Sequence, residues 1–212
     1  EIDTYLAETA AALTVEHPDY SYLAARIKVN SLHKETPGFI IATKNLYDDG
    51  LLREDYYKKV MENADLIESV IDYDKDYTFD YFALTTLIRA YLLKFDNKTI
   101  ERPQDLWMRV TLTVTGNEFN LDKIKETYKS LSTGMYTHAT PTLFNSGLKM
   151  QQLSSCFLIG MEDDSIEGIF NTIKDCALIS KTAGGIGMHA HNIRGSGSRI
   201  KSTNGKSNGL IP

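Results

Sequence analysis

Hydrophobic residues recur every three or four positions along the first two thirds of the chain, which is the spacing of a helix face packed on a core. Helix boundaries agree with this spacing, since Pro18 and Pro103 suit a first helical turn, Asn120 suits an N-cap and Gly134 suits a C-terminal end. We expect the apolar faces to form one helical core rather than a cofactor site. The predicted helices cover residues 4–14, 18–36, 53–71, 78–94, 103–110 and 120–134.

The pattern changes after Thr137. Residues 138–142 are polar, and a proline disfavours helical backbone in the residue before it, so Thr140 is predicted to be extended. The short apolar run over residues 156–159 predicts a strand that is buried on both faces. The last third of the chain is therefore predicted to contain strands as well as helices.

A further helix is predicted to begin at Asp164 and Ser165, where Glu167 has the spacing of a capping box. A glycine pair ends this helix, and residues 186–193 predict a second strand. Two strands joined by a helix of this length predict a parallel crossover unit, with which either a barrel or a doubly wound sheet could begin. The stripe predicted to be buried consists of Ile166, Ile169, Phe170, Ile173 and Ala177.

Composition is that of an ordinary globular protein, with 42% hydrophobic and 24% charged residues. No apolar run approaches the roughly 20 residues of a membrane helix, and a net charge of -5 argues against sequence-independent binding to nucleic acid. Two cysteines are too few for a disulfide framework, which favours a reducing compartment such as the cytoplasm. Neither Glu1 nor Pro212 has the character of a natural domain end, so we expect a piece of a longer protein.

Two glycine-rich segments resemble nucleotide-binding motifs without meeting their requirements. Residues 184–187 follow a predicted helix, whereas a dinucleotide fingerprint precedes one. Residues 205–207 lack the earlier glycine of a phosphate-binding loop, because Ile200 stands there. The loop over residues 194–209 carries four cationic side chains among glycines and serines, which is compatible either with anion binding or with a plain flexible connection.

Four residues raise the question of metal or thiol chemistry. His189 and His191 share one face of a predicted strand, but two ligands do not make a metal site, and none is predicted. Cys176 lies within a helical pattern and is interpreted as a small buried apolar residue. Cys156 follows two serines at the start of a strand, which leaves a redox or nucleophilic role open beside a structural one.

Long strings in a fixed order resemble the large subunit of class I ribonucleotide reductase, in its eukaryotic form. The resemblance covers essentially the whole chain in register, so it is far more specific than any single glycine motif. The strings are residues 17–20, 23–27, 32–36, 102–104, 137–145, 152–158, 164–169, 180–187, 203–205 and 207–210.

This resemblance implies a helical N-terminal domain over residues 1–149 and, over residues 150–212, the first elements of the family's ten-stranded α/β barrel. It implies reduction of ribonucleoside diphosphates at the 2′-carbon by thiol and radical chemistry. Cys156 corresponds to one of two thiols that supply electrons and become a disulfide. The other thiol, the radical-bearing cysteine and the assisting residues are expected beyond Pro212. The positions that correspond to substrate contacts are Thr140, Pro141, Ser155, Gly184 and Gly185.

The resemblance also implies a site where a deoxynucleoside triphosphate selects the base to be reduced. In the family, the helix that begins at this site packs against its mate in a second subunit. Residues 195–199 depart from the commoner string, which leaves the exact phosphate ligands open. The corresponding effector-binding positions are Asp164, Ser165, Ile166, Lys181, Arg194 and Lys201.

The expected partners are a small subunit that carries a di-metal site and a tyrosyl radical, thioredoxin or glutaredoxin as reductant, and a second copy of the large subunit. The expected small molecules are ribonucleoside diphosphates and, with Mg, deoxynucleoside triphosphate or ATP effectors. No covalent cofactor is expected, and neither nucleic acid nor membrane is an expected partner. Two rival classes remain. A non-catalytic nucleotide-binding regulatory module would bind effectors but be indifferent to Cys156, and a helical interaction protein would bind no nucleotide.

Overall fold

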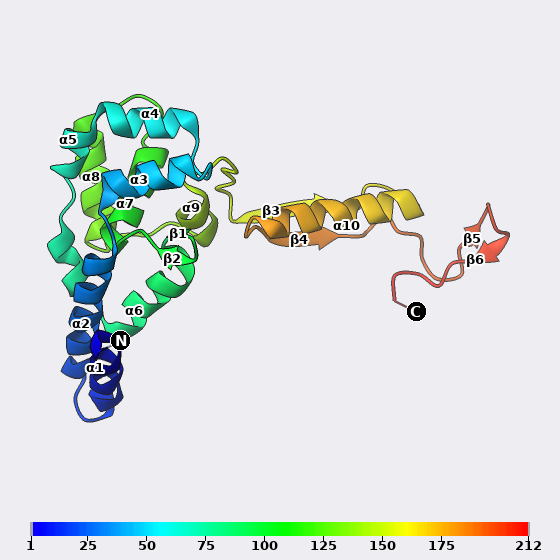
Figure 1. Cartoon of the computed structure of the whole chain (residues 1–212). Helices are drawn as coiled ribbons and strands as arrows, with labels where there is room; N and C mark the ends of the chain where they lie inside the picture. Colours follow the sequence, from blue (N-terminus) through cyan, green and yellow to red (C-terminus); the bar gives the residue numbers. More distant parts are fainter. Residues whose placement is uncertain (1, 212) are drawn as a thin grey trace. The chain divides into compact units, whose positions relative to one another are not determined.

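A computed structural model describes residues 2–211, and the chain divides into two units, Glu1–Gln151 and Gln152–Pro212 (Figure 1). Unit 1 is mainly helical, as its sequence periodicity predicts. Its α-helices are α1 (Ile2–Ala12), α2 (Asp19–Glu35), α3 (Phe39–Asp48), α4 (Glu54–Glu62), α5 (Ala64–Glu68), α6 (Tyr81–Thr86), α7 (Pro103–Val114), α8 (Leu121–Ser132) and α9 (Thr140–Asn145). Shorter elements are the 3-10 helices η1 (Leu13–Val15) and η2 (Tyr73–Thr78), the π-helical turn η3 (Leu87–Tyr91), and the antiparallel pair β1 (Lys94–Phe95) and β2 (Lys98–Thr99).

The core of unit 1 is built around α7, which is buried at every position from Pro103 to Leu112. Helix α8 packs against it, together with η2 and α9. The start of α8 matches its prediction, because the side chain of Asn120 accepts a hydrogen bond of 3.0 Å from the backbone N–H of Lys123. The spacing of Leu121, Ile124, Tyr128 and Leu131 predicts an apolar stripe, and the last three of these residues are buried.

Several helix boundaries in unit 1 differ from the prediction. The single helix expected over residues 53–71 is two helices, because the backbone at Asn63 leaves the helical region between α4 and α5. Helix α3 was not predicted, and it follows Gly38, whose φ of +92° favours glycine. In α2 the apolar face predicted from Leu23, Ala24, Ile27 and Leu32 is partly wrong. Leu23 is 48% exposed, while Ala25 and Val29 are buried.

Buried polar side chains connect α7 to α2 and η2. Asp76 is fully buried and contacts His33 Nε2 at 2.8 Å, while Gln104 Nε2 donates to its other carboxylate oxygen at 3.1 Å. Asp105 accepts hydrogen bonds from the Tyr73 hydroxyl at 2.7 Å and from the Arg102 backbone N–H at 2.8 Å. Burial raises the pKa of Asp76 above its ordinary value and raises the pKa of Asp105 to about 7.

Unit 2 contains a parallel strand pair, β3 (Cys156–Gly160) and β4 (Gly185–His189), joined by α10 (Ile166–Lys181). The predicted crossover unit is therefore confirmed, with Cys156 opposite Gly185 and Gly160 opposite His189. Residues 194–209 are not a plain loop, because β5 (Arg199–Ile200) and β6 (Gly205–Lys206) form a short antiparallel hairpin within them. Strand β4 is shorter than predicted and ends at His189.

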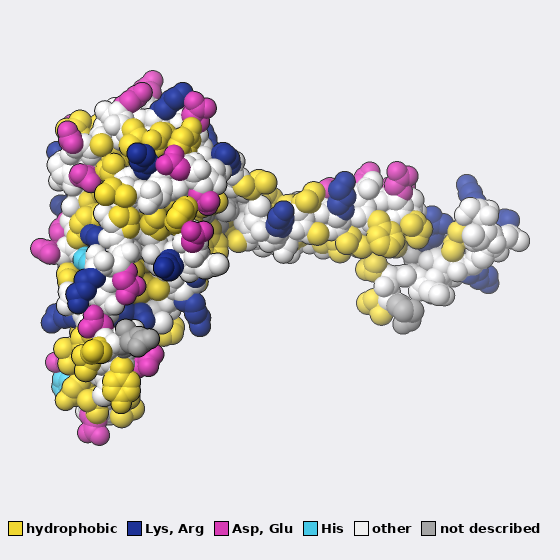
Figure 2. Space-filling model, in the orientation of Figure 1, with side chains coloured by type: hydrophobic (Ala, Val, Ile, Leu, Met, Phe, Trp, Pro, Cys, Tyr) yellow, Lys and Arg dark blue, Asp and Glu magenta, His cyan; other side chains and the backbone are white. Residues whose placement is uncertain are grey.

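The apolar surfaces of unit 2 are exposed where the sequence predicted burial. Leu158 in β3 is 93% exposed, and on α10 Ile166 is 74% and Phe170 63% exposed. Figure 2 shows hydrophobic side chains at the surface along this strand–helix–strand segment. The reason is that α10 covers only one face of the β3–β4 pair. The other face of the strands and the outer face of α10 have no further layer packed on them among the described residues.

Candidate functional site

The start of β3 brings together four of the residues singled out from the sequence. The carbonyl oxygen of Ser155 accepts a hydrogen bond of 2.7 Å from the backbone N–H of Gly185, and Cys156 lies opposite Gly185 in the strand register. Cys156 is a free, exposed thiol. Gly184 immediately precedes this strand pair, so Ser155, Cys156 and both glycines share one end of it.

The two glycines allow close approach of backbone at this strand end. A Cβ atom at Gly184 would lie 2.6 Å from Ile179 Cγ2 and 2.9 Å from Phe157 Cε2, and one at Gly185 would lie 3.2 Å from the carbonyl oxygen of Ser155. Any side chain at Gly184 would therefore collide with Ile179 on α10 and with Phe157 on β3, the strand that carries Cys156. The chain reverses at Ala183, which has a φ of +64°. The glycine pair thus has a steric role at the site that no dinucleotide fingerprint explains.

Thr140 and Pro141 lie in unit 1, on α9. The prediction that Thr140 is extended is wrong: it is the first residue of a short helix, with Pro141 in the first turn, where proline loses no helical hydrogen bond. The Thr140 hydroxyl lies 3.2 Å from the hydroxyl of Tyr91, whose ring stacks on Phe144 with centroids 4.9 Å apart. Pro141 is buried. Helix α9 is thereby fixed against η3.

A buried ion pair anchors the other end of α9. Arg109 on α7 and Glu101 are both buried, and their two contacts are 2.6 Å and 3.1 Å long. The remaining guanidinium nitrogen, Nη1, donates to the carbonyl oxygens of Leu143 at 3.1 Å and Ser146 at 2.9 Å. Tyr91, Glu101 and Arg109 were not predicted from the sequence. An arginine inside an otherwise apolar helical run was the available signal, because such a charge is buried only with a partner.

The start of α10 gathers a second group of predicted residues. Ser165 is the N-cap, and its hydroxyl accepts from the Gly168 backbone N–H at 3.0 Å. The expected capping box from Asp164 to Glu167 is wrong by one residue, since Ser165 and not Asp164 caps the helix. Asp164 instead accepts from Arg194, with 2.6 Å from Nε to the carboxylate and 2.9 Å from Nη2 to the backbone carbonyl.

Two predicted effector residues lie away from that group. Lys181 is the last residue of α10 and Ile166 the first, so the 16-residue helix separates them by about 23 Å at 1.5 Å per residue. Lys201 lies exposed in the turn of the β5–β6 hairpin, where Arg199 donates to Asn204 at 2.9 Å. Within one copy of the chain, the structure thus assembles Asp164, Ser165, Ile166 and Arg194 but not Lys181.

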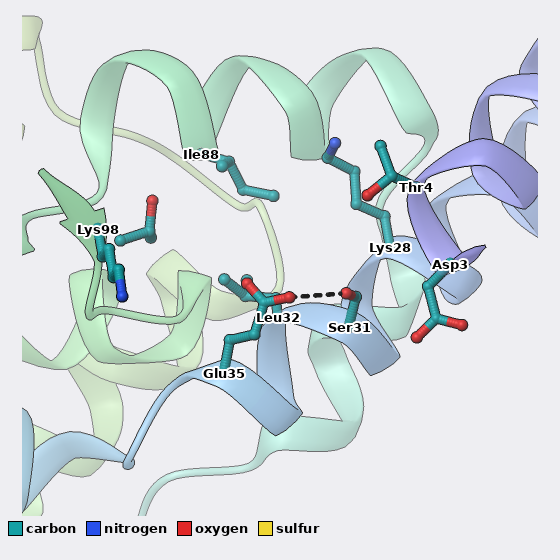
Figure 3. Close-up of a pocket in the computed structure, with 9 residues that line it drawn as sticks. Asp3, Thr4, Lys28, Ser31, Leu32, Glu35, Ile88 and Lys98 are labelled. Atoms are coloured by element: carbon teal, nitrogen blue, oxygen red, sulfur yellow. Dashed lines mark hydrogen bonds between the residues drawn. The ribbon is translucent and has the colours of Figure 1, made fainter. Parts of the chain in front are cut away.

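A separate cavity of about 480 Å³ lies in unit 1 and contains none of the predicted site residues. Figure 3 shows its lining side chains on α1, α2, η3 and β2, with Ser31 and Glu35 joined by a hydrogen bond of 3.0 Å. Acidic Asp3 and Glu35 face it together with basic Lys28 and Lys98, so the lining has no excess of either charge.

Neither a metal cluster nor a membrane span is found in the part of the chain that the structure describes. Among residues 2–211, no three His, Cys, Asp or Glu side chains gather in an arrangement that could hold a metal ion. The described helices are too short or too polar to cross a bilayer.

Comparison with known proteins gives two family matches and many relatives. Residues 77–151 match the ribonucleotide reductase all-alpha domain, and residues 154–212 match the ribonucleotide reductase barrel domain. The chain is 48% identical to ribonucleoside-diphosphate reductase large chain 2 of Saccharomyces cerevisiae, 47% identical to the large subunit of Arabidopsis thaliana and 48% identical to that of vaccinia virus strain Copenhagen. Each similarity covers 100% of this chain but only 25%, 27% and 28% of the relative, so the chain spans about a quarter of their length. The two family matches and the whole-chain identity show that this chain belongs to the ribonucleotide reductase large-subunit family.

Proposed function

We propose that this chain is part of an enzyme that reduces ribonucleoside diphosphates to deoxyribonucleoside diphosphates. The observation that carries the proposal is the exposed thiol of Cys156 at the end of the β3–β4 pair, in a chain whose relatives are named ribonucleoside-diphosphate reductases. Replacing the 2′-hydroxyl by hydrogen consumes two electrons. Two thiols supply them, giving a disulfide and releasing the hydroxyl oxygen as water, so the second thiol must come from another cysteine.

In this proposal Cys156 is one of those two thiols. Cys176 does not suit the second role, because it lies half-buried within α10 and both cysteines are free. The Ser155 and Gly185 backbones hold the start of β3 against β4, which fixes the direction of the Cys156 side chain. In the proposed enzyme, a tyrosyl radical next to a di-metal site in a separate small subunit would supply the one-electron oxidation that starts the reaction. Thioredoxin or glutaredoxin then restores the dithiol, a step suited to the cytoplasm.

The substrate contacts proposed from the resemblance are Thr140, Pro141, Ser155, Gly184 and Gly185. The Thr140 hydroxyl is a hydrogen-bonding group at the start of α9, and Ser155 and Gly185 are exposed next to each other. We further infer that β3 and β4 are neighbouring strands of a ten-stranded α/β barrel. Their parallel pairing, their exposed apolar faces and the barrel-domain match support this inference.

The proposed effector site is the start of α10, where a deoxynucleoside triphosphate would bind with Mg. Asp164 can accept a hydrogen bond from a sugar hydroxyl through its carboxylate, while Arg194 offsets its charge and supplies further donors to phosphate. Lys181 fits this site only if it comes from a second copy. Two α10 helices packed antiparallel through their exposed stripes would bring each Lys181 towards the Asp164 of the other copy, which supports a homodimer.

The test of the enzymatic proposal is diphosphate reduction by the native-length protein with its small subunit and thioredoxin. We expect Cys156→Ser to abolish turnover and Cys176→Ser to leave it near the wild-type rate. Normal turnover by the Cys156 variant would make this thiol structural. An inactive wild type that still binds deoxynucleoside triphosphates would favour the non-catalytic regulatory module.

A further inference from the structure

Resting on the proposed function, we infer that Tyr91 is a positioning residue that orients the Thr140 hydroxyl toward the substrate. The two hydroxyl oxygens are 3.2 Å apart, and they come from elements 49 residues apart in the sequence. Tyr91 ends the π-helical turn η3, and Thr140 begins α9. The contact therefore depends on tertiary structure and joins one of the expected substrate-binding residues to a side chain that has no assigned role.

We place the Thr140 hydroxyl against the diphosphate group of the substrate, and that contact determines the direction of its hydrogen bond with Tyr91. Ionised phosphate oxygens accept hydrogen bonds and donate none. A threonine hydroxyl has one proton and two lone pairs, so Thr140 can donate to such an oxygen only if its contact with Tyr91 uses a lone pair. Tyr91 must then be the donor. The phenol thus holds the Thr140 hydroxyl in the rotamer whose proton points away from Tyr91.

The position of Tyr91 is fixed independently of its hydroxyl. Its ring stacks on Phe144 with an interplanar angle of 28°, one helical turn beyond Thr140 on α9. The backbone of η3 places it there, because the N–H of Leu92 bonds to the carbonyl of Leu87, five residues back, at 3.0 Å. A π-helical turn of this kind is uncommon and frequently occurs at functional sites.

The C-terminal end of α9 is held by a separate set of hydrogen bonds. Arg109 binds the carbonyl oxygens of Leu143 and Ser146 while paired with Glu101 in the core. Helix α9 is therefore fixed at its C-terminal end by a buried cation and at its N-terminal end by Tyr91. The contact with the Tyr91 hydroxyl then restricts rotation of the Thr140 side chain.

The experiment compares four forms of the native-length protein, namely wild type, Tyr91→Phe, Thr140→Val and the double variant. Equilibrium binding of a ribonucleoside diphosphate and steady-state reduction with the small subunit and thioredoxin are both measured. Tyr91→Phe keeps the ring on Phe144 and removes only the hydroxyl. Tyr77→Phe is the matched control, because its hydroxyl makes a comparable bond of 2.7 Å to Asn30 on another part of unit 1.

We expect Tyr91→Phe to raise Kd and KM about threefold to tenfold, the effect of one lost hydrogen bond, with kcat within twofold and an unchanged melting temperature. In the Thr140→Val background the tyrosine change should have no further effect. Thr140→Ser, which keeps the hydroxyl, should remain sensitive to Tyr91→Phe.

Three results would overturn the inference. One is wild-type Kd and KM in Tyr91→Phe while Thr140→Val is impaired. This result would exclude the positioning role of Tyr91 and leave the proposed function intact. Another is a Tyr91→Phe effect of full size in the Thr140→Val background, which means that the tyrosine acts elsewhere. A wild type that binds no diphosphate would overturn the inference and the proposed function together.

Discussion

The two units of this chain differ in what they bury. Unit 1 encloses charged and polar side chains, including Asp76, Asp105 and the Glu101–Arg109 pair, each with named hydrogen-bond partners. Unit 2 leaves large apolar side chains such as Leu158 and Phe170 in solvent. Satisfied polar groups in a core specify one arrangement of helices, whereas exposed apolar faces indicate surfaces that pack against something further. The core of unit 1 is thus formed by its own residues, whereas the apolar faces of unit 2 indicate that it packs against something further.

The largest effect should come from breaking the buried pair of unit 1. Arg109→Met leaves Glu101 buried without its partner, and removal of one member of such a pair costs about 3–5 kcal/mol of unfolding free energy. The control is Lys58→Met, which breaks the exposed pair between Lys58 and Glu54 and should cause no measurable change. Denaturant unfolding of the native-length protein, followed by hydrogen exchange of α7, measures both. Equal stability of the two variants would mean that the core of unit 1 does not depend on the pair.

A second effect in unit 1 depends on pH. The pKa of Asp105 is about 7 in the folded state, above its ordinary value of 3.8, because burial disfavours the charged carboxylate. Between these two pKa values the folded state therefore binds more protons than the unfolded state. The contribution of Asp105 to the free energy of unfolding is greatest below about pH 4 and is lost as the pH rises to about 7. This contribution is at most about 4 kcal/mol, because each unit of pKa difference corresponds to about 1.4 kcal/mol.

Asp105→Asn cannot ionise and should flatten this pH dependence, although it also weakens the acceptor contacts with Tyr73 and Arg102. The opening free energy of α7 from amide hydrogen exchange, corrected for intrinsic exchange rates, is the measurement. An identical slope between pH 4 and pH 7 in the wild type and the variant would exclude Asp105 as its source.

In unit 2 the sharpest test is directed at the exposed stripe of α10. We expect Phe170→Asp to weaken dimerisation of the native-length protein more than tenfold, because it places a charge on the face proposed to meet a second copy. Lys174→Ala, on the same helix, should have little effect. Sedimentation at saturating deoxynucleoside triphosphate distinguishes the two. If Phe170→Asp dimerises like the wild type, the stripe is covered by another part of the protein.

The last prediction concerns the affinity for the effector. Arg194→Ala removes the cation that pairs with Asp164, and we expect effector affinity to fall about fivefold to thirtyfold. Arg194→Lys keeps the charge but loses the two-point contact, so it should give an intermediate value. The matched control is Arg199→Ala, which loses only its bond to Asn204 in the hairpin. A calorimetric titration that finds wild-type affinity for Arg194→Ala would remove this residue from the site.

The sequence was most informative where local rules decide the structure. The Asn120 cap, the proline at the start of α7 and the strand–helix–strand order all depend on nearby residues, and the structure has them. The errors arose where tertiary packing prevails. Thr140 is helical despite the proline after it, and the Phe170 stripe is exposed because periodicity identifies an apolar face without identifying what covers it.

The candidate sites show the same division. The order of strand, helix and strand predicted the parallel pairing of β3 and β4, and the turn sequence placed Asp164 and Ser165 at a helix start. The register that sets Cys156 beside Gly185 was not predicted. The contact between Tyr91 and Thr140 could not be predicted, because it joins two segments through the geometry of a π-helical turn. The roles of the site residues remain predictions, since they derive from the resemblance and not from a bound ligand.

The wide turn at Leu87–Tyr91 also constrains how this part of the chain can change in length. A π-helical turn accommodates one residue more than an α-helical turn, so loss of a single residue between Leu87 and Tyr91 would restore a regular helix without disrupting it. The side chains on either side of the turn would keep their faces, so Tyr91 would still meet Thr140. In a regular α-helix, by contrast, loss of one residue rotates every later side chain by about 100° around the helix axis. A change of one residue in length should therefore be better tolerated at this turn than within a regular helix such as α7.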